Sequence, residues 1–300
     1  MRRFGLPSVL VLLAALGWSA PSPAQDIEDA VYVYDLFHAA DNCLELFARL
    51  RRLPLRPMVI LSVEQGPDFI LDHPAGEARL RCVLRFLNGS SRRVKALFLQ
   101  DPVFLEGGQE AVRRAALLGD FVARHPGELA GAQVDVEPHG HGTWPNGSAA
   151  VRRRLLEGLY DVLRQVRPRL AGLPLGVVVP WWYADLAREL PGAAPGALFQ
   201  MADELYLMTY GDGNPTPGEN HAASLLARLD GAYAFSDSGR THVVLSTREF
   251  PSAAHLEAEL QRLRWVLAFQ PNFAGTAVFH ASSGFQTVLS GPPPRPSGVR

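Results

Sequence analysis

The sequence predicts a single (β/α)8 barrel, and three observations point to this fold class. The chain has 300 residues, which is an ordinary length for one such barrel. Its hydrophobic content of 47% is enough to fill one large core. Eight short apolar segments alternate with longer segments of helical periodicity, and no linker or internal repeat interrupts them.

The eight predicted strands are short, rich in β-branched residues and mostly apolar on both faces. Parallel strands that are covered by helices have this composition, because neither face of the sheet meets water. In chain order the predicted strands are Ala30–Tyr34, Met58–Val63, Val94–Leu99, Ala132–Val136, Leu175–Val179, Glu204–Met208, His242–Leu245 and Gly275–Phe279.

Helices are predicted between the strands, where apolar residues recur every three to four positions. In one of these segments Leu155, Leu159 and Val162 form an apolar face opposite a run of arginines, which predicts a solvated outer surface. The predicted helices are Ala40–Leu53, Glu77–Leu87, Gly108–His125, Ala149–Arg167, Tyr183–Leu190, Glu219–Phe235 and Ala253–Phe269.

The N-terminal residues 1–24 predict a secretory signal peptide. Arg2 and Arg3 form a short basic start, and Val9–Leu16 is an apolar run that is too short to span a bilayer. The small residues just before Gln25 fit a cleavage site. We therefore expect an exported protein, secreted or periplasmic, with no membrane span.

The barrel domain is expected over residues 25–290, followed by a disordered proline-rich tail over residues 291–300. The formal net charge is −1, so no global field attracts nucleic acid or an anionic membrane. The sequence also lacks a glycine-rich phosphate loop. We expect neither a nucleic-acid partner nor a cofactor, and the sequence leaves the oligomeric state open.

The chain has two cysteines, Cys43 and Cys82, which fall in the first two predicted helices. Successive outer helices of a barrel are neighbours, and export permits a disulfide bond. Two interpretations remain open from the sequence. The cysteines form a bridge, or they are two small buried hydrophobic side chains.

A polar or aromatic side chain follows every predicted strand. The C-terminal ends of the strands carry the active sites of (β/α)8 barrels, and a purely structural barrel would not need such residues there. This predicted rim is acidic and aromatic, which suits neutral or amino sugars better than phosphates. Its residues are Asp35, Glu64, Gln65, Gln100, Asp101, Asp135, Glu137, Trp181, Trp182, Tyr183, Tyr210, Asp212, Arg248, Glu249 and His280.

The fourth predicted strand ends in two carboxylates, Asp135 and Glu137. Residues two apart on a strand point to the same side, so Gln133, Asp135 and Glu137 form one row from the barrel interior toward the rim. Neighbouring carboxyls raise one another's pKa, which is how a glutamate can hold a proton as a general acid near neutral pH. Pro138 then ends the strand, because it has no N–H to donate.

These residues resemble glycoside hydrolase family 18, the chitinase-like barrels. The segment Ala130–Glu137 is similar to the family's D-x-x-D-x-D-x-E signature, and Asp135 and Glu137 match its last Asp and its Glu. The family's M-x-Y motif on strand 6 is matched by Met208 and Tyr210. In the order and spacing of its elements the resemblance covers most of the mature chain.

The resemblance implies an exported glycoside hydrolase that acts on a polysaccharide or an N-acetylated glycan without a metal ion. Glu137 would protonate the glycosidic oxygen, while Asp135 and Tyr210 orient the substrate's N-acetyl group as it attacks the anomeric carbon. Only one of the two adjacent tryptophans can face a ligand. The substrate-binding candidates are Asp35, Glu64, Asp101, Gln133, Trp181, Trp182, Asp212, Glu249 and His280.

The chain departs from the family pattern at three positions. Ala130 and Gln133 replace the first two aspartates of the signature, and His280 stands where the family usually has a tryptophan under the reacting sugar. An altered specificity would fit these departures. A non-catalytic barrel that binds carbohydrate and takes part in polysaccharide handling would fit them too.

Two further interpretations use the same part of the sequence. Retaining glycosidases carry an acid on strand 4, commonly as N-E-P, and a nucleophilic glutamate on strand 7, and here Glu137 and Glu249 stand at those places. His139 and His141 form an H-x-H pair that could belong to a zinc site, although no third ligand is evident.

Overall fold

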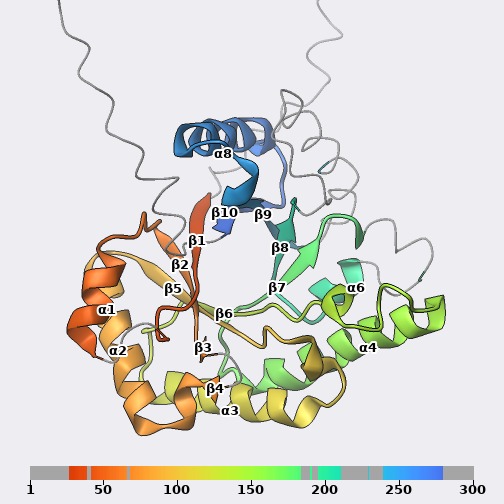
Figure 1. Cartoon of the computed structure of the whole chain (residues 1–300), viewed down its shortest axis with the longest axis horizontal. Coiled ribbons are helices and arrows are strands. Elements are labelled where there is room, and N and C mark those ends of the chain that lie inside the picture. The colour runs from red at the N-terminus through yellow and green to blue at the C-terminus, as the bar shows by residue number, and fades with distance from the viewer. Residues whose placement is uncertain are drawn as a thin grey trace, which may run out of the picture.

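The computed structural model describes residues 27–38, 42–65, 68–183, 190, 195–210, 229 and 239–279. Eight parallel strands close into a barrel with helices around it, so the predicted fold class is confirmed (Figure 1). Each strand pairs with its sequence neighbours around the barrel, and β1 pairs with β10. The strands are β1 (Glu28–Val33), β2 (Met58–Ser62), β5 (Arg93–Phe98), β6 (Gly131–Val134), β7 (Leu175–Pro180), β8 (Glu204–Met208), β9 (Arg240–Ser246) and β10 (Phe273–Phe279).

The strands are buried on both faces, as their continuous apolar composition predicts. Alternate residues point into the barrel and outward, so that Tyr32 of β1 lies inside while Val31 and Val33 pack under the helices. The inner cluster consists of Ala30, Tyr32, Met58, Ile60, Leu97, Val178, Tyr206, Met208, Val244 and Ala277.

Barrel closure depends on a close approach between β1 and β10. Gly275 pairs with Glu28, and a Cβ at position 275 would lie 1.9 Å from the backbone oxygen of Glu28. The strand register shifts between Phe273 and Gly275 where β10 meets β9. A residue without a side chain is therefore required at this position.

The helices cover the outside of the barrel (Figure 1). They are α1 (Cys43–Leu50), α2 (Pro74–Gly89), α3 (Gly108–Arg124), α4 (Ala149–Val166), α6 (Pro195–Phe199) and α8 (Ala253–Leu267). Side-chain caps set three of their starts: Asn42, Ser148 and Ser252 accept hydrogen bonds from backbone N–H groups of the first turns of α1, α4 and α8.

Short turns that the sequence did not predict follow several strands. The hairpin of β3 (Glu64–Gln65) and β4 (Asp68–Phe69) comes after β2 and leads into the 3-10 helix η1 (Ile70–Asp72). The 3-10 helices η2 (Pro102–Leu105), η3 (Pro138–Gly140) and η5 (Thr247–Glu249) follow β5, β6 and β9, and η4 (Arg167–Arg169) follows α4. Proline at the first positions of η2 and η3 fixes where these turns begin.

Several predicted segments lie outside the described residues. These are the signal peptide over residues 1–24, the tail over residues 291–300, and most of the helices at 183–190 and 219–235. Among the residues that the structure does describe, no helix is both long and apolar enough to cross a membrane.

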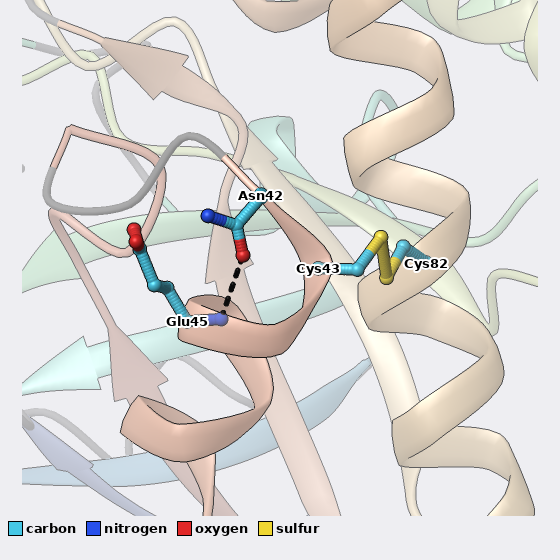
Figure 2. The surroundings of a disulfide bond; sticks show 4 residues. All are labelled: Asn42, Cys43, Glu45 and Cys82. Atoms are coloured by element: carbon cyan, nitrogen blue, oxygen red, sulfur yellow. Dashed lines mark hydrogen bonds between the residues drawn. A yellow bond between two sulfur atoms is a disulfide. The ribbon is translucent and has the colours of Figure 1, made fainter.

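The two cysteines form a disulfide bond between α1 and α2, which decides between the two interpretations of the sequence (Figure 2). The Cα atoms of Cys43 and Cys82 are 6.0 Å apart. Cys43 is the first residue of α1, directly after its cap Asn42. The bridge therefore ties the start of the first helix to the second.

We expect the double variant Cys43→Ala/Cys82→Ala to lose about 2–4 kcal/mol of unfolding free energy, because the bridge restricts the unfolded chain. The measurement is denaturant unfolding with and without reductant. Reductant should destabilise the wild type to the level of the variant and leave the variant unchanged. Equal stability of wild type and variant under oxidising conditions would contradict a formed bridge.

Candidate active site

The two carboxylates Asp135 and Glu137 stand just beyond the C-terminal end of β6. The strand ends at Val134, two residues earlier than predicted, and the chain stays extended through Glu137 before η3 begins at Pro138. The backbone N–H of Asp135 still donates to the carbonyl of Leu99, 3.3 Å away. Asp135 and Glu137 therefore keep the alternation of the strand and stay on one side of it.

Asp135 is a partly buried carboxyl, and only one of its two oxygens has a hydrogen-bond partner among the described residues. Tyr34 Oη donates to its Oδ2 at 3.3 Å, and its buried Oδ1 has no hydrogen-bond partner among the described residues. Burial raises the pKa of Asp135 well above its usual value, and the negative charge of Glu137 adds to this effect. Asp135 therefore holds its proton to a higher pH than an exposed aspartate does.

Glu137 is the more accessible of the two, with a third of its side chain exposed. Burial raises the pKa of Glu137 as well. His139 lies beside it, with Nε2 3.5 Å from Oε2 of Glu137. A carboxyl with a raised pKa that still reaches solvent can deliver a proton to a bound molecule.

Tyr210 follows β8 and stands near the same carboxyls. Its ring stacks on Phe279 at 5.3 Å between centroids. Burial raises its pKa well above the usual value, and the charges of Asp135 and Glu137 are among the further causes. The structure thus brings together the three residues that the sequence predicted as catalytic.

Tyr34 is the site residue that the sequence reasoning left out. It lies one residue beyond β1, donates to Asp135 and packs edge-on against Phe279 at 5.5 Å. The sequence pattern could have indicated Tyr34, because Tyr32 and Tyr34 are two residues apart at the end of a strand and so face the barrel interior together.

Gln133 lies one pleat deeper than Asp135 but is bonded elsewhere. It is fully buried, and its Nε2 donates to Tyr32 Oη. Its Oε1 has no hydrogen-bond partner within the described part of the chain. Gln133 therefore supports Tyr32 from inside the barrel.

Glu64 is engaged by the protein on both carboxylate oxygens. It accepts hydrogen bonds from the backbone N–H groups of Leu99 and Gln100, at 2.8 and 3.0 Å, and pairs with Arg114 at 2.6 Å. Leu99 has a φ of 57°, an unfavourable conformation for a bulky side chain. Since the carbonyl of Leu99 accepts from Asp135, Glu64 fixes the backbone that holds Asp135.

The other predicted rim residues differ in their surroundings. Asp101 caps η2 through a hydrogen bond from the backbone N–H of Val103, and Asp35 is exposed with a φ of 54°. Glu249 ends η5, and its negative charge acts on Tyr210. Asp212 and His280 lie outside the described residues.

Both tryptophans after β7 are partly buried against the outer core rather than the inner cluster. The ring of Trp182 lies 5.2 Å from His139 and 5.0 Å from Tyr183, in edge-to-face geometry. Trp144 packs beside it at 6.3 Å. Trp182 therefore packs against His139 of η3, the residue that lies beside Glu137.

The two histidines of the H-x-H motif do not converge on one point. His139 faces Glu137, whereas Nε2 of His141 lies 2.8 Å from Glu106 and its Nδ1 lies 2.8 Å from Thr143. This divergence removes the basis for the zinc interpretation.

A second acidic grouping lies at the opposite, N-terminal end of the barrel. Potential ligand atoms of Glu28, Glu204 and His242 are within 4.8 Å of one another. The buried ammonium of Lys95 already pairs with Glu204 at 2.5 Å and with Glu28 at 3.6 Å. Burial alone would raise the pKa of Glu204, but Lys95 lowers it overall. The lysine thus supplies the positive charge that a metal ion would otherwise bring.

Comparisons with known proteins place the fold among solved barrels. No protein-family model and no curated protein matches the chain. The exo-β-1,4-mannosidase Op5Man5 from Opitutaceae bacterium strain TAV5 is similar with a TM-score of 0.57 and 13% identity, over 85% of this chain and 52% of the mannosidase chain. This chain thus spans about half of the mannosidase's length.

Two further solved structures are similar over nearly their whole length. A GH18 chitinase from Pseudoalteromonas aurantia has a TM-score of 0.51 and 12% identity, over 85% of this chain and 94% of its own. The AHE enzyme from Alicyclobacillus herbarius has a TM-score of 0.55 and 10% identity, over 86% and 88%. The fold is one that glycoside hydrolases use. At these identities the likeness concerns the fold alone, and the site carries the functional argument.

We expect Asp135→Asn to raise the melting temperature at pH 7 by about 2–4 °C. The pKa of Asp135 is higher in the folded than in the unfolded chain, so its contribution to stability falls as pH rises from the unfolded value through the folded one. Asparagine does not titrate, so the variant avoids this loss of stability at pH 7. The gain should vanish below about pH 4, where the carboxyl is protonated in both states.

Calorimetric melting between pH 3 and pH 8 measures this difference, with Asp120→Asn on the exposed face of α3 as the matched control. Destabilisation by Asp135→Asn of equal size at every pH would show that the bond from Tyr34 outweighs the carboxyl's burial.

Proposed function

We propose that the protein is a glycoside hydrolase in which Glu137 is the general acid. The observation that carries this proposal is the pair of partly buried carboxyls just beyond the end of β6, both with raised pKa, of which Glu137 reaches solvent. They stand where (β/α)8 barrels place their chemistry. A protonated glutamate at that place is the group that glycosidic cleavage requires, because the leaving oxygen needs a proton.

Asp135 and Tyr210 are proposed to orient the substrate. Asp135 offers an oxygen that no described residue satisfies, and Tyr210 carries a hydroxyl next to the two carboxyls. In a substrate-assisted route the carbonyl oxygen of an N-acetyl group attacks the anomeric carbon, the glycosidic bond breaks, and the leaving oxygen takes the proton of Glu137. Water then attacks the anomeric carbon and opens the cyclic intermediate, and the carboxylate of Glu137 takes one proton from that water.

The proposed substrate is a polysaccharide or N-acetylated glycan, consistent with the resemblance to chitinase-like barrels and with a GH18 chitinase among the similar structures. The proposed site of action is outside the cytoplasm, on the strength of the signal-peptide pattern in residues 1–24. Among the substrate-binding candidates, Trp182 is proposed to contact a sugar beside Glu137, because its ring packs against His139, which lies next to Glu137.

We expect Glu137→Gln to lower kcat by 100-fold or more, because general acid catalysis contributes about 10²–10⁴-fold. The wild-type rate should fall as pH rises through the raised pKa of Glu137, since only the protonated carboxyl can donate. A hydrolysis screen over a glycan panel measures both effects. Glu106→Gln, an exposed glutamate in the neighbouring turn, is the matched control.

Undiminished hydrolysis by Glu137→Gln would overturn the assignment of the acid. Glycan binding by the wild type without turnover on any member of the panel would instead favour a non-catalytic carbohydrate-binding barrel.

In a rival assignment Glu249 is a covalent nucleophile. Its negative charge acts on Tyr210, which lies near Asp135 and Glu137, and this favours the rival assignment enough to test it. If the substrate assists, Asp135→Asn loses most of the rate and Glu249→Gln keeps most of it. If Glu249 is the nucleophile, Glu249→Gln loses 1000-fold or more and a glycosyl–enzyme adduct forms on Glu249 in the wild type. Intact-protein mass spectrometry with an activated fluorosugar distinguishes the two outcomes.

A further inference from the structure

His139 has a defined environment next to the proposed acid. The turn η3 folds the chain back on itself, with the backbone N–H of Gly140 donating to the carbonyl of Glu137 at 2.9 Å. This turn brings Nε2 of His139 to 3.5 Å from Oε2 of Glu137. The ring is held edge-to-face by Trp182 and Tyr183, with centroids 5.2 and 6.0 Å away. Its orientation is therefore set by packing.

The surroundings of His139 also indicate which ring nitrogen carries the proton. Nδ1 is buried and has no hydrogen-bond partner among the described residues. A buried N–H without an acceptor is less favourable than a buried lone pair without a donor. The tautomer with the proton on Nε2 avoids the buried N–H and directs its donor at Glu137.

We propose that His139 is a positioning residue for Glu137: its neutral imidazole donates the Nε2 hydrogen to Oε2 and leaves Oε1 to carry the transferable proton. The inference rests on the proposed role of Glu137 and extends it. A separation of 3.5 Å is long for a hydrogen bond, and such bonds at active sites shorten when substrate binds.

The charge state of His139 supports this role. Burial lowers the pKa of His139 to about 4, so the ring is neutral at the pH where Glu137 must hold its proton. A neutral donor favours the carboxylate less than a cation would, and Glu137 can still be protonated. A lysine or arginine at the same place would hold Glu137 ionised, as Lys95 does for Glu204 at the other end of the barrel.

Other titratable groups lie near Glu137, and their charges also affect its titration. Asp135 lies on the same segment, Tyr32 comes from β1, Tyr183 follows β7, and Tyr210 follows β8 with Glu249 beyond it. The charge of Glu137 raises the pKa of Asp135 and of each of these three tyrosines. None of these groups changes in the variants below, so a difference between them reports on His139.

The test follows the titration of Glu137 by carboxyl 13C NMR in glutamate-labelled protein, with the signal assigned by Glu137→Gln. His139→Phe keeps a ring against Trp182 but lacks the donor, so the titration midpoint should rise by about half a pH unit or more. His139→Gln keeps an N–H in reach and should restore the wild-type midpoint. His141→Phe, which removes a ring bonded to Glu106, should leave the midpoint unchanged.

Long-range 1H–15N spectra of the wild type provide a second measurement that needs no variant, and they should show the proton of His139 on Nε2. A proton on Nδ1, an unmoved midpoint in His139→Phe, or an equal rise in His141→Phe would overturn the proposal.

These measurements use no substrate, so they stand even if the protein hydrolyses no glycan. Where a hydrolysed substrate is found, the pH at which the rate falls on the alkaline side of its pH profile should rise in His139→Phe. The rise should equal that of the titration midpoint of Glu137. If the alkaline fall of the rate stays at the same pH while the titration midpoint of Glu137 moves, His139 acts on Glu137 but Glu137 is not the general acid.

Discussion

Closure of eight parallel strands into a barrel is the constraint on which the rest of this structure depends. The last strand must hydrogen-bond to the first, and Gly275 permits this by letting β10 approach the backbone of β1 where any Cβ would collide. Closure brings all the C-terminal strand ends to one rim. Residues far apart in the chain, Tyr34 and Asp135, then come within hydrogen-bonding distance.

The pKa values of the carboxyls at the two ends of the barrel are shifted in opposite directions. At the N-terminal end Lys95 compensates Glu204, whose pKa is lowered, and this ion pair is buried within the barrel. At the C-terminal end Asp135 and Glu137 lie next to each other, and burial raises the pKa of both. An uncompensated pair of this kind lowers stability at neutral pH and provides a proton donor, as expected at functional sites. Glu64 and Arg114 keep the supporting backbone in place.

Much of the fold and part of the site could be predicted, because both follow from local patterns. The predicted strands match the observed ones to within two residues, since continuous apolar runs identify buried parallel strands. The D-x-E spacing placed Asp135 and Glu137 on one side of a strand end for the same reason. The chemistry of Glu64 could not be read in this way. Its partners Leu99 and Arg114 come from other repeats, so only the folded chain shows that its carboxylate is already bonded.

The sequence by itself determined the barrel and the place of Asp135 and Glu137 at the end of a strand, because period-two and helical patterns are properties of neighbouring residues. Only the tertiary structure decided that Cys43 and Cys82 form a bridge, that Gln133 bonds to Tyr32, and that His139 faces Glu137 while His141 faces away. Each of these depends on the direction of a side chain across a gap of a few ångströms. Such directions are set by packing between distant segments, as Trp182 sets the ring of His139.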